Sequence, residues 1–174
     1  MCNFLSAIVK RDSELICKPD VTDSHEDLID FAGLVDDGRG SFVRLELLPT
    51  GNDFGNVDEY TLKVDPADTP EWFTSEMRER VDSSLRERVR RMIVADDRKI
   101  LLGGCWIVTD GAKIERSINA TLRIDGGNIK RIHEGDIKWI DGGNIERIYG
   151  GNIERISGGN IEWIHGGTIK HDER

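Results

Sequence analysis

The C-terminal part of the chain consists of a repeated eight-residue sequence. From Gly126 it reads GGNIKRIH, EGDIKWID, GGNIERIY, GGNIERIS, GGNIEWIH and GGTIK, and it is preceded by the fainter copies GGCWIVTD, GAKIERSI and the seven-residue NATLRID. Of the 19 glycines, 14 lie at or after Gly103, whereas all four prolines precede it. Glycine pairs disfavour helix and readily adopt the backbone conformations of tight turns. The repeat therefore predicts short β-strands separated by glycine corners.

One arrangement that suits this repeat is a β-solenoid in which two units form a coil of about 16 residues. Equivalent side chains then stack on the residue 16 positions away, and the isoleucines fill a narrow core. The order of the units favours this arrangement, because similar residues recur in alternate units. The expected columns are His133, Tyr149 and His165; Asp141 and Ser157; Asn128, Asn144 and Asn160; and Asp136, Asn152 and Thr168.

The alternative is an antiparallel β-meander of six-residue strands joined by two-residue glycine turns. It pairs Arg147 with Glu154 across the turn, but it places successive isoleucine pairs on opposite faces, so no continuous core forms. The solenoid has a difficulty of its own, because both isoleucines of an Ile-x-x-Ile unit point inward only if the strand bends between them. We favour the solenoid and keep the meander as the alternative.

Residues 1–98 are expected to form a small α+β domain, and residues 99–174 the octapeptide-repeat solenoid. Apolar spacing in the first part predicts strands over residues 4–9, 14–17, 42–48 and 60–64. Ser24 is suited to cap a short helix that ends at Gly33. A second helix, with Thr69 as its cap and Pro70 in its first turn, is expected to reach about Val94.

Composition excludes several classes of protein. The chain has 174 residues, with 24 Lys and Arg against 33 Asp and Glu, a net charge of −9. Residues 1–70 contain 6 basic and 15 acidic side chains and so hold that whole excess. This balance argues against a general nucleic-acid binder, and no apolar run approaches the length that spans a bilayer. The basic residues near the start follow the apolar stretch instead of preceding it, so a secretory signal is not expected.

Three cysteines at unrelated spacings, with no Cys-x-x-Cys, argue against a disulfide framework and a zinc site. We therefore expect a cytoplasmic protein without a metal or cofactor.

Four segments of the first domain carry a resemblance to known proteins: the start Met-Cys-Asn-Phe-Leu-Ser-Ala-Ile and residues 22–29, 42–46 and 69–73. They resemble a group of small proteins of unknown activity from bacteria and their phages, in which such a domain precedes short β-repeats. The likeness covers roughly residues 1–95. It implies a phage or mobile-element origin, a role in conflict between phage and host, and the host cytoplasm as the location. It implies no reaction.

Cys2 is the sharpest candidate for an enzymatic residue. If Met1 is removed, the thiol and a free α-amino group share one residue, the arrangement used by N-terminal-nucleophile hydrolases and glutamine amidotransferases. The α-amino group, with a pKa near 8, then serves as the base. His25 is the candidate partner of Cys2 in space. A hydrolase or amidotransferase that uses Cys2 and His25 is thus the alternative function.

The repeat offers candidate binding residues. Trp139 and Trp163 occupy the unit position that holds arginine elsewhere, as in Arg147 and Arg155, and Tyr149 lies between two histidines in its column. Exposed tryptophan among arginines suits a contact surface for a partner, and packing at the corners of the coils is the alternative interpretation. His133 and His165 are two coils apart, too far to share a metal.

The favoured function is thus a non-enzymatic interaction or assembly protein. It would bind a protein partner or a second copy through the repeat, or a small signalling ligand through the first domain.

Overall fold

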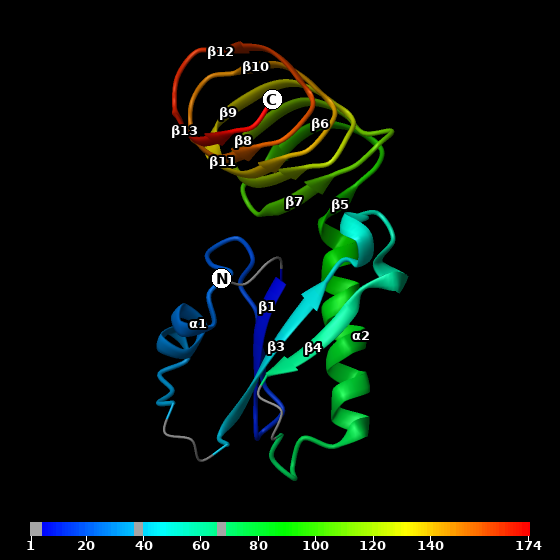
Figure 1. Ribbon diagram of the computed structural model, residues 1–174, viewed down its shortest axis with the longest axis vertical. Helices are drawn as coiled ribbons and strands as arrows, with labels where there is room; N and C mark the ends of the chain where they lie inside the picture. The colour runs from blue at the N-terminus through cyan, green and yellow to red at the C-terminus, as the bar shows by residue number, and fades with distance from the viewer. Residues whose placement is uncertain (1–4, 37–39, 66–68) are drawn as a thin grey trace. The chain divides into compact units, whose positions relative to one another are not determined.

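The computed structural model describes residues 5–36, 40–65 and 69–174, which form two compact units (Figure 1). The units are Met1–Arg90 and Arg91–Arg174. The boundary expected from the sequence lay after residue 98. The second unit begins earlier because strand β5 (Ile93–Val94) already pairs with a strand of the repeat, β7 (Cys105–Val108).

The first unit contains an antiparallel four-stranded sheet in the order β2-β1-β3-β4. Its strands are β1 (Leu5–Lys10), β2 (Leu15–Ile16), β3 (Phe42–Leu48) and β4 (Thr61–Asp65). Two short 3₁₀ helices, η1 (Thr50–Asn52) and η2 (Val57–Glu59), connect β3 to β4. The α+β architecture expected for this part of the chain is confirmed.

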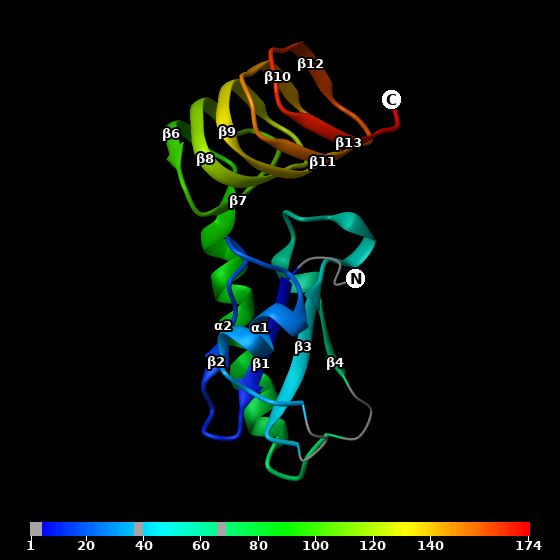
Figure 2. The same cartoon turned by 90° about the vertical axis from the view of Figure 1, so that its left-hand side faces the viewer.

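Helix α1 (His25–Phe31) covers part of one face of this sheet. It begins where the sequence predicts, because the hydroxyl of Ser24 accepts a hydrogen bond from the Asp27 backbone N–H. Its buried Leu28 packs in one cluster with Ile8 of β1 and Phe42 of β3. The sheet lies between α1 and the longer helix α2 (Ser75–Met92), as Figures 1 and 2 show.

Helix α2 buries an apolar stripe formed by Val81, Leu85 and Val89. It begins later than expected. The residue that caps it is Thr74, whose hydroxyl accepts from the Met77 N–H at 3.2 Å, and not Thr69. Pro70 instead belongs to a turn closed by the hydrogen bond from Phe73 N to its carbonyl. In the described part of the chain, neither helix has the length and apolar character that crossing a membrane requires.

The polar face of α2 is tied to the rest of the unit by arginines. The guanidinium of Arg86 forms an ion pair with Asp82 at 2.8 Å and donates to the carbonyls of Val57 and Tyr60 at 2.5 and 2.6 Å. Arg88 donates to the carbonyl of Cys17. These charge-assisted bonds satisfy carbonyl groups of the connecting loops.

The second unit is a β-solenoid of about five turns with about 16 residues per coil. Every strand pair in it is parallel, so the meander is not the observed arrangement. Besides β5 and β7, its strands are β6 (Asp97–Leu102), β8 (Lys113–Ile124), β9 (Asn128–Ile140), β10 (Asn144–Ile148), β11 (Asn152–Ile156), β12 (Asn160–Ile164) and β13 (Thr168–Asp172).

The coils present two sides, because β8 and β9 each run across both. The first side consists of β6, residues 113–118 of β8, residues 128–132 of β9, β10 and β12. The second side consists of β5, β7, the remainders of β8 and β9, β11 and β13.

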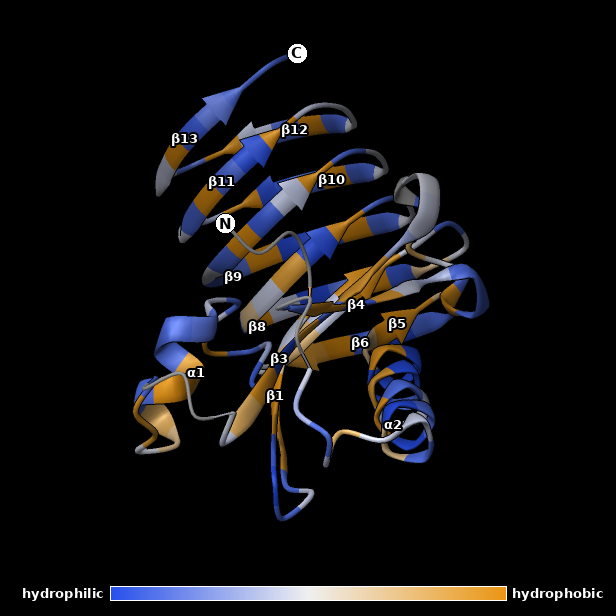
Figure 3. Ribbon diagram, turned by 60° about the horizontal axis from the view of Figure 1, so that its bottom comes forward, coloured by the Kyte–Doolittle hydropathy of each residue, from blue (hydrophilic) through white to orange (hydrophobic). Residues whose placement is uncertain are grey.

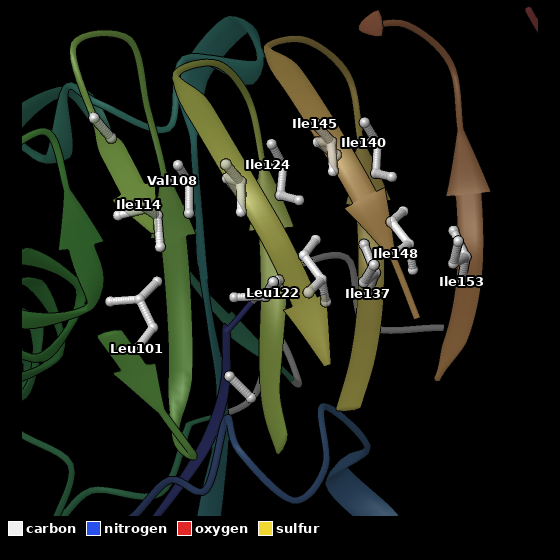
Figure 4. Packing of buried hydrophobic residues seen from close by; sticks show 14 of the residues in the cluster. Leu101, Val108, Ile114, Leu122, Ile124, Ile137, Ile140, Ile145, Ile148 and Ile153 are labelled. Atoms are coloured by element: carbon white, nitrogen blue, oxygen red, sulfur yellow. The ribbon is translucent and has the colours of Figure 1, made fainter. Parts of the chain in front are cut away.

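The core is a set of stacked isoleucine columns. In the central coils both isoleucines of a unit are buried, for example Ile129 and Ile132 at 1% and 0% exposure, while Lys130 and Arg131 between them are exposed. The bend that Ile-x-x-Ile requires is therefore present in these units. Figure 3 shows the resulting alternation of hydrophobic and hydrophilic bands, and Figure 4 shows the apolar side chains filling the space between the two sides.

The two kinds of corner differ in how much space they leave. A Cβ atom built on Gly142 would lie 2.5 Å from the carbonyl oxygen of Asp125, and one on Gly158 would lie 2.2 Å from that of Asp141. At the other corner, a Cβ on Gly150 would meet only the Glu134 side chain, at 3.7 Å. This second corner is where the repeat itself replaces the first glycine with Glu134.

The seven-residue unit NATLRID is accommodated by a bulge. Between β8 and β9 the pairing offset is 15 residues as far as Leu122, which pairs with Ile137, and 16 residues from Arg123, which pairs with Trp139. A bulge inserts one unmatched residue into a ladder without ending it. The next coils therefore return to an offset of 16.

Polar side chains stack along the coils as the sequence predicts. The amide of Asn144 donates to Asn128 at 3.1 Å, and that of Asn152 donates to Asp136 at 3.0 Å. On the same column, the hydroxyl of Thr168 donates to the Asn152 oxygen at 2.8 Å. Ser157 likewise donates to Asp141. Each bond joins residues 16 apart, which confirms the predicted coil length.

Candidate functional site

The first side of the solenoid carries a column of arginines on its outer surface, which we call the arginine column. Arg131 and Arg147 are paired in the register of β9 and β10. Arg116 lies opposite Arg131, because the residue after it, Ser117, pairs with Ile132. The column is bounded by Ile100, which pairs with Arg116, and by Trp163, which pairs with Arg147. Arg147 and Trp163 were expected from the sequence as binding residues.

The three guanidinium groups of this column have no partner among the residues that the structure describes. No ion pair or side-chain hydrogen bond there involves Arg116, Arg131 or Arg147. The second side differs, since Lys138 pairs with Glu154 at 2.8 Å and Arg155 pairs with Glu173 at 2.7 Å. Positive charge is thus neutralised on the second side and left available on the first.

An aromatic column lies beside the arginine column, at the adjacent corner of the coils. The His133 and Tyr149 rings stack with their centroids 4.7 Å apart, and Tyr149 stacks on His165 at 5.2 Å. Trp163 joins the two columns, because its ring lies 6.2 Å from that of His165. The predicted stack of Tyr149 between two histidines is confirmed, and the faces of neighbouring rings in the stack cover one another.

The second side holds the other predicted binding residues, in a different setting. The guanidinium of Arg123 lies 3.9 Å from the centroid of the Trp139 ring and is buried, with 8% of Arg123 exposed. Arg155 pairs with Trp139 by register on the next coil. The structure therefore separates Trp139 and Arg155 from Trp163, Arg147 and Tyr149, because these groups belong to opposite sides of the coil.

A groove of about 710 Å³ also runs along the first side, next to the arginine column. Its lining mixes both signs of charge, with Lys113 and Lys130 beside Glu115 and Glu146. Such alternation leaves little net charge in the groove. The positive charge of this side is consequently concentrated in the arginine column.

The predicted enzymatic pair is described only in part, because Cys2 lies outside the described residues. His25 is 6% exposed, and its Nε2 atom lies 2.9 Å from the carbonyl oxygen of Leu45, so this ring joins α1 to the sheet. A hollow of about 600 Å³ beside it is lined by Asp23, Glu26 and other charged residues. Burial raises the pKa of the Cys17 thiol, which makes this cysteine a poor nucleophile.

Within residues 5–36, 40–65 and 69–174, no group of three or more His, Cys, Asp or Glu side chains is placed to hold a metal ion. Comparison with known proteins finds no matching family model, curated protein or solved structure.

Proposed function

We propose that this chain is a non-enzymatic interaction and assembly protein, and that the last coil of its solenoid associates with the same coil of a second copy. The observation that carries the proposal is the exposure of core residues in β12 and β13. Ile145 and Ile148, one coil earlier, are 1% and 0% exposed. The equivalent of Ile148 on β12, Ile164, is 37% exposed, and Ile169 on β13, the equivalent of the 1% exposed Ile153, is 41% exposed.

The strand edges at this coil support the same interface. Among the described strands, β12 pairs only with β10 and β13 only with β11, so each presents one unpaired row of backbone N–H and C=O groups. An unpaired edge beside exposed apolar side chains is a template for another strand. Association would continue the isoleucine core and the ladder together.

Among the described strands, β6 at the opposite end of the solenoid also has an unpaired edge, but the core side chains there are buried, which favours a dimer over a fibre. Val94 and Leu101, which lie in the first coil, are 0% and 1% exposed. A surface that can pair only with itself gives an isologous, two-fold interface, in which facing strands run antiparallel. We therefore expect association to stop at two copies.

A local ion pair limits the charge at this end. Asp172 occupies the position that Ile156 has in the coil before, and the Arg174 guanidinium lies 2.7 Å from its carboxylate. Hydrogen bonding from Arg174 lowers the pKa of Asp172 to about 2, so the carboxylate stays ionised and paired at neutral pH. The charge that faces the second copy is therefore balanced.

Sedimentation velocity of the 174-residue chain over a wide concentration range tests the proposal. We expect a monomer–dimer equilibrium, and we expect the double variant Ile164→Glu/Ile169→Glu to remain monomeric. Leu102→Glu is the matched control, because Leu102 is a 71% exposed apolar residue on β6, at the other end of the solenoid. The control should associate like the unchanged chain.

Three outcomes would contradict the proposal. The first is a strict monomer at high concentration, and the second is a double variant that dimerises as well as the unchanged chain. The third is an equal loss of association in Leu102→Glu. Circular dichroism establishes that each variant keeps its strand content.

A further inference from the structure

The arginine column combines regular spacing with unneutralised charge. Neighbouring parallel strands lie about 4.8 Å apart, so three successive coils place three guanidinium groups in a row at about that interval. Arg116 and Arg131 are exposed and Arg147 is half-buried. No described residue offers these three side chains a carboxylate partner, although the whole chain carries a net charge of −9. Such a row attracts an anion that can reach several of its members.

The ends of the column set the length of such an anion. Ile100 precedes Arg116 and Trp163 follows Arg147 in the same register, so the column holds three charges and no more. Two intervals of about 4.8 Å separate the outer two arginines. A ligand that reaches all three arginines therefore has to place anionic oxygens along a line of up to about 10 Å.

The chemistry of the guanidinium group favours phosphate. Guanidinium presents a planar fork of donors that matches phosphate oxygens. The two oxygens of a carboxylate lie in one plane and match one such fork, whereas the oxygens of a phosphate group point in more directions and can face more than one neighbouring guanidinium. In a linear oligophosphate, the oxygens of neighbouring phosphate groups can therefore reach more than one of the stacked arginines.

The neighbouring aromatic column argues against a nucleic-acid strand as the occupant. Proteins that bind single strands use exposed ring faces on which bases stack. Here the faces of His133, Tyr149 and His165 cover one another at 4.7 and 5.2 Å. A long polyanion would also extend beyond the three arginines toward Glu162, which is exposed next to Trp163. A short ligand without bases avoids both problems.

We propose that Arg116, Arg131 and Arg147 form a binding site for a short linear oligophosphate of about three phosphate groups. This site is separate from the coil end that forms the proposed dimer interface. Binding to it does not require association, and association does not require it.

Isothermal titration calorimetry with sodium tripolyphosphate at low ionic strength tests the site. We expect saturable binding, with Arg131→Gln weakening it at least about tenfold, because the central guanidinium contributes charge-assisted hydrogen bonds to both flanking phosphates. Arg131→Lys should recover part of the loss, since it keeps the charge but not the planar fork. Lys130→Gln is the matched control. It removes the same charge from the same strand but from the neighbouring column, and we expect a change of no more than about threefold.

Orthophosphate and a ten-nucleotide thymidylate strand are the comparison ligands. Both should bind at least about tenfold more weakly than tripolyphosphate, because orthophosphate spans fewer arginines and the mutual stacking of His133, Tyr149 and His165 leaves the bases little ring face beside the column. Failure to bind tripolyphosphate would overturn the proposal. An equal effect of Lys130→Gln and Arg131→Gln, or tighter binding of thymidylate, would overturn it as well. Circular dichroism of each variant shows whether its fold is intact.

Discussion

Gly142 and Gly150 occupy equivalent positions in successive repeat units but should respond in opposite ways to the same substitution. Neither has a backbone φ in the left-handed region, so the difference lies in the surrounding space. The Cβ atom of Gly142→Ala would lie 2.5 Å from the Asp125 carbonyl oxygen, 0.9 Å closer than the 3.4 Å at which ordinary contact begins. The neighbouring main chain would have to move, and that chain holds the coil-to-coil hydrogen bond from Asn144 N to Gly127 O at 2.8 Å.

The size of the effect follows from these contacts. Forcing an extra carbon into a packed position costs about 1–3 kcal/mol. Gly150→Ala meets only the flexible Glu134 side chain at 3.7 Å, and the added methyl group restricts the unfolded chain, which stabilises by about 0.4–1 kcal/mol. The free energies of unfolding of the two variants should therefore differ by roughly 1.5–4 kcal/mol. For a unit of this size that difference corresponds to at least about 6 °C in Tm.

Thermal and urea unfolding followed by far-ultraviolet circular dichroism measure this difference. Gly158→Ala provides a replicate of the crowded corner, because its Cβ would lie 2.2 Å from the Asp141 carbonyl oxygen. Equal midpoints for Gly142→Ala and Gly150→Ala would refute the assignment of two distinct corners. So would a Gly150→Ala protein less stable than Gly142→Ala.

Three further predictions concern single side chains. Asn152→Asp should lower the free energy of unfolding by about 1 kcal/mol in urea denaturation, because the new carboxylate cannot donate to Asp136 and repels it. Ser117→Ala should raise the free energy of unfolding by about 1 kcal/mol, because the Ser117 hydroxyl is buried without a hydrogen-bond partner in the described chain. A Tm equal to or below that of the unchanged protein would contradict this prediction. Iodoacetamide at pH 8 should modify Cys105 faster than Cys17, as peptide mass spectrometry can measure. Burial raises the pKa of the Cys17 thiol and so keeps the reactive thiolate scarce until the pH rises further, whereas Cys105 is partly exposed.

The solenoid could be predicted from sequence because its columns repeat the same chemistry at a fixed interval. Asn128 and Asn144, or His133 and Tyr149, are 16 residues apart, and the structure joins each pair across neighbouring coils. The first unit was predictable for a related reason, since alternation in residues 42–48 matches the bounds of β3. Local caps were less certain, because Thr69 and Thr74 both have the chemistry of a helix cap and only the surrounding turn selects Thr74.

The arginine column was not predicted, and the cause is the short unit NATLRID. Arg116 and Arg131 are 15 residues apart, so a search at intervals of 16 joins Arg131 to Arg147 but misses Arg116. Trp139 and Trp163 share a unit position but lie 24 residues apart, one and a half coils, which assigns them to opposite sides. The difference between the two corners could not be predicted from the sequence either, because the clash that distinguishes them involves main-chain atoms of the preceding coil.

Because two units with different columns form each coil, the solenoid also limits how the gene can change in length. Near-identical tandem sequences gain and lose copies by slippage during replication, and the smallest step that the protein sequence suggests is one octapeptide, or 24 nucleotides. A gain of one octapeptide would move every later unit to the opposite side, so that the residues at His165 and Ser157 would exchange columns. A gain of 48 nucleotides would add a whole coil and preserve each column. Length variants of this gene that keep a folded product should therefore differ in steps of 16 codons.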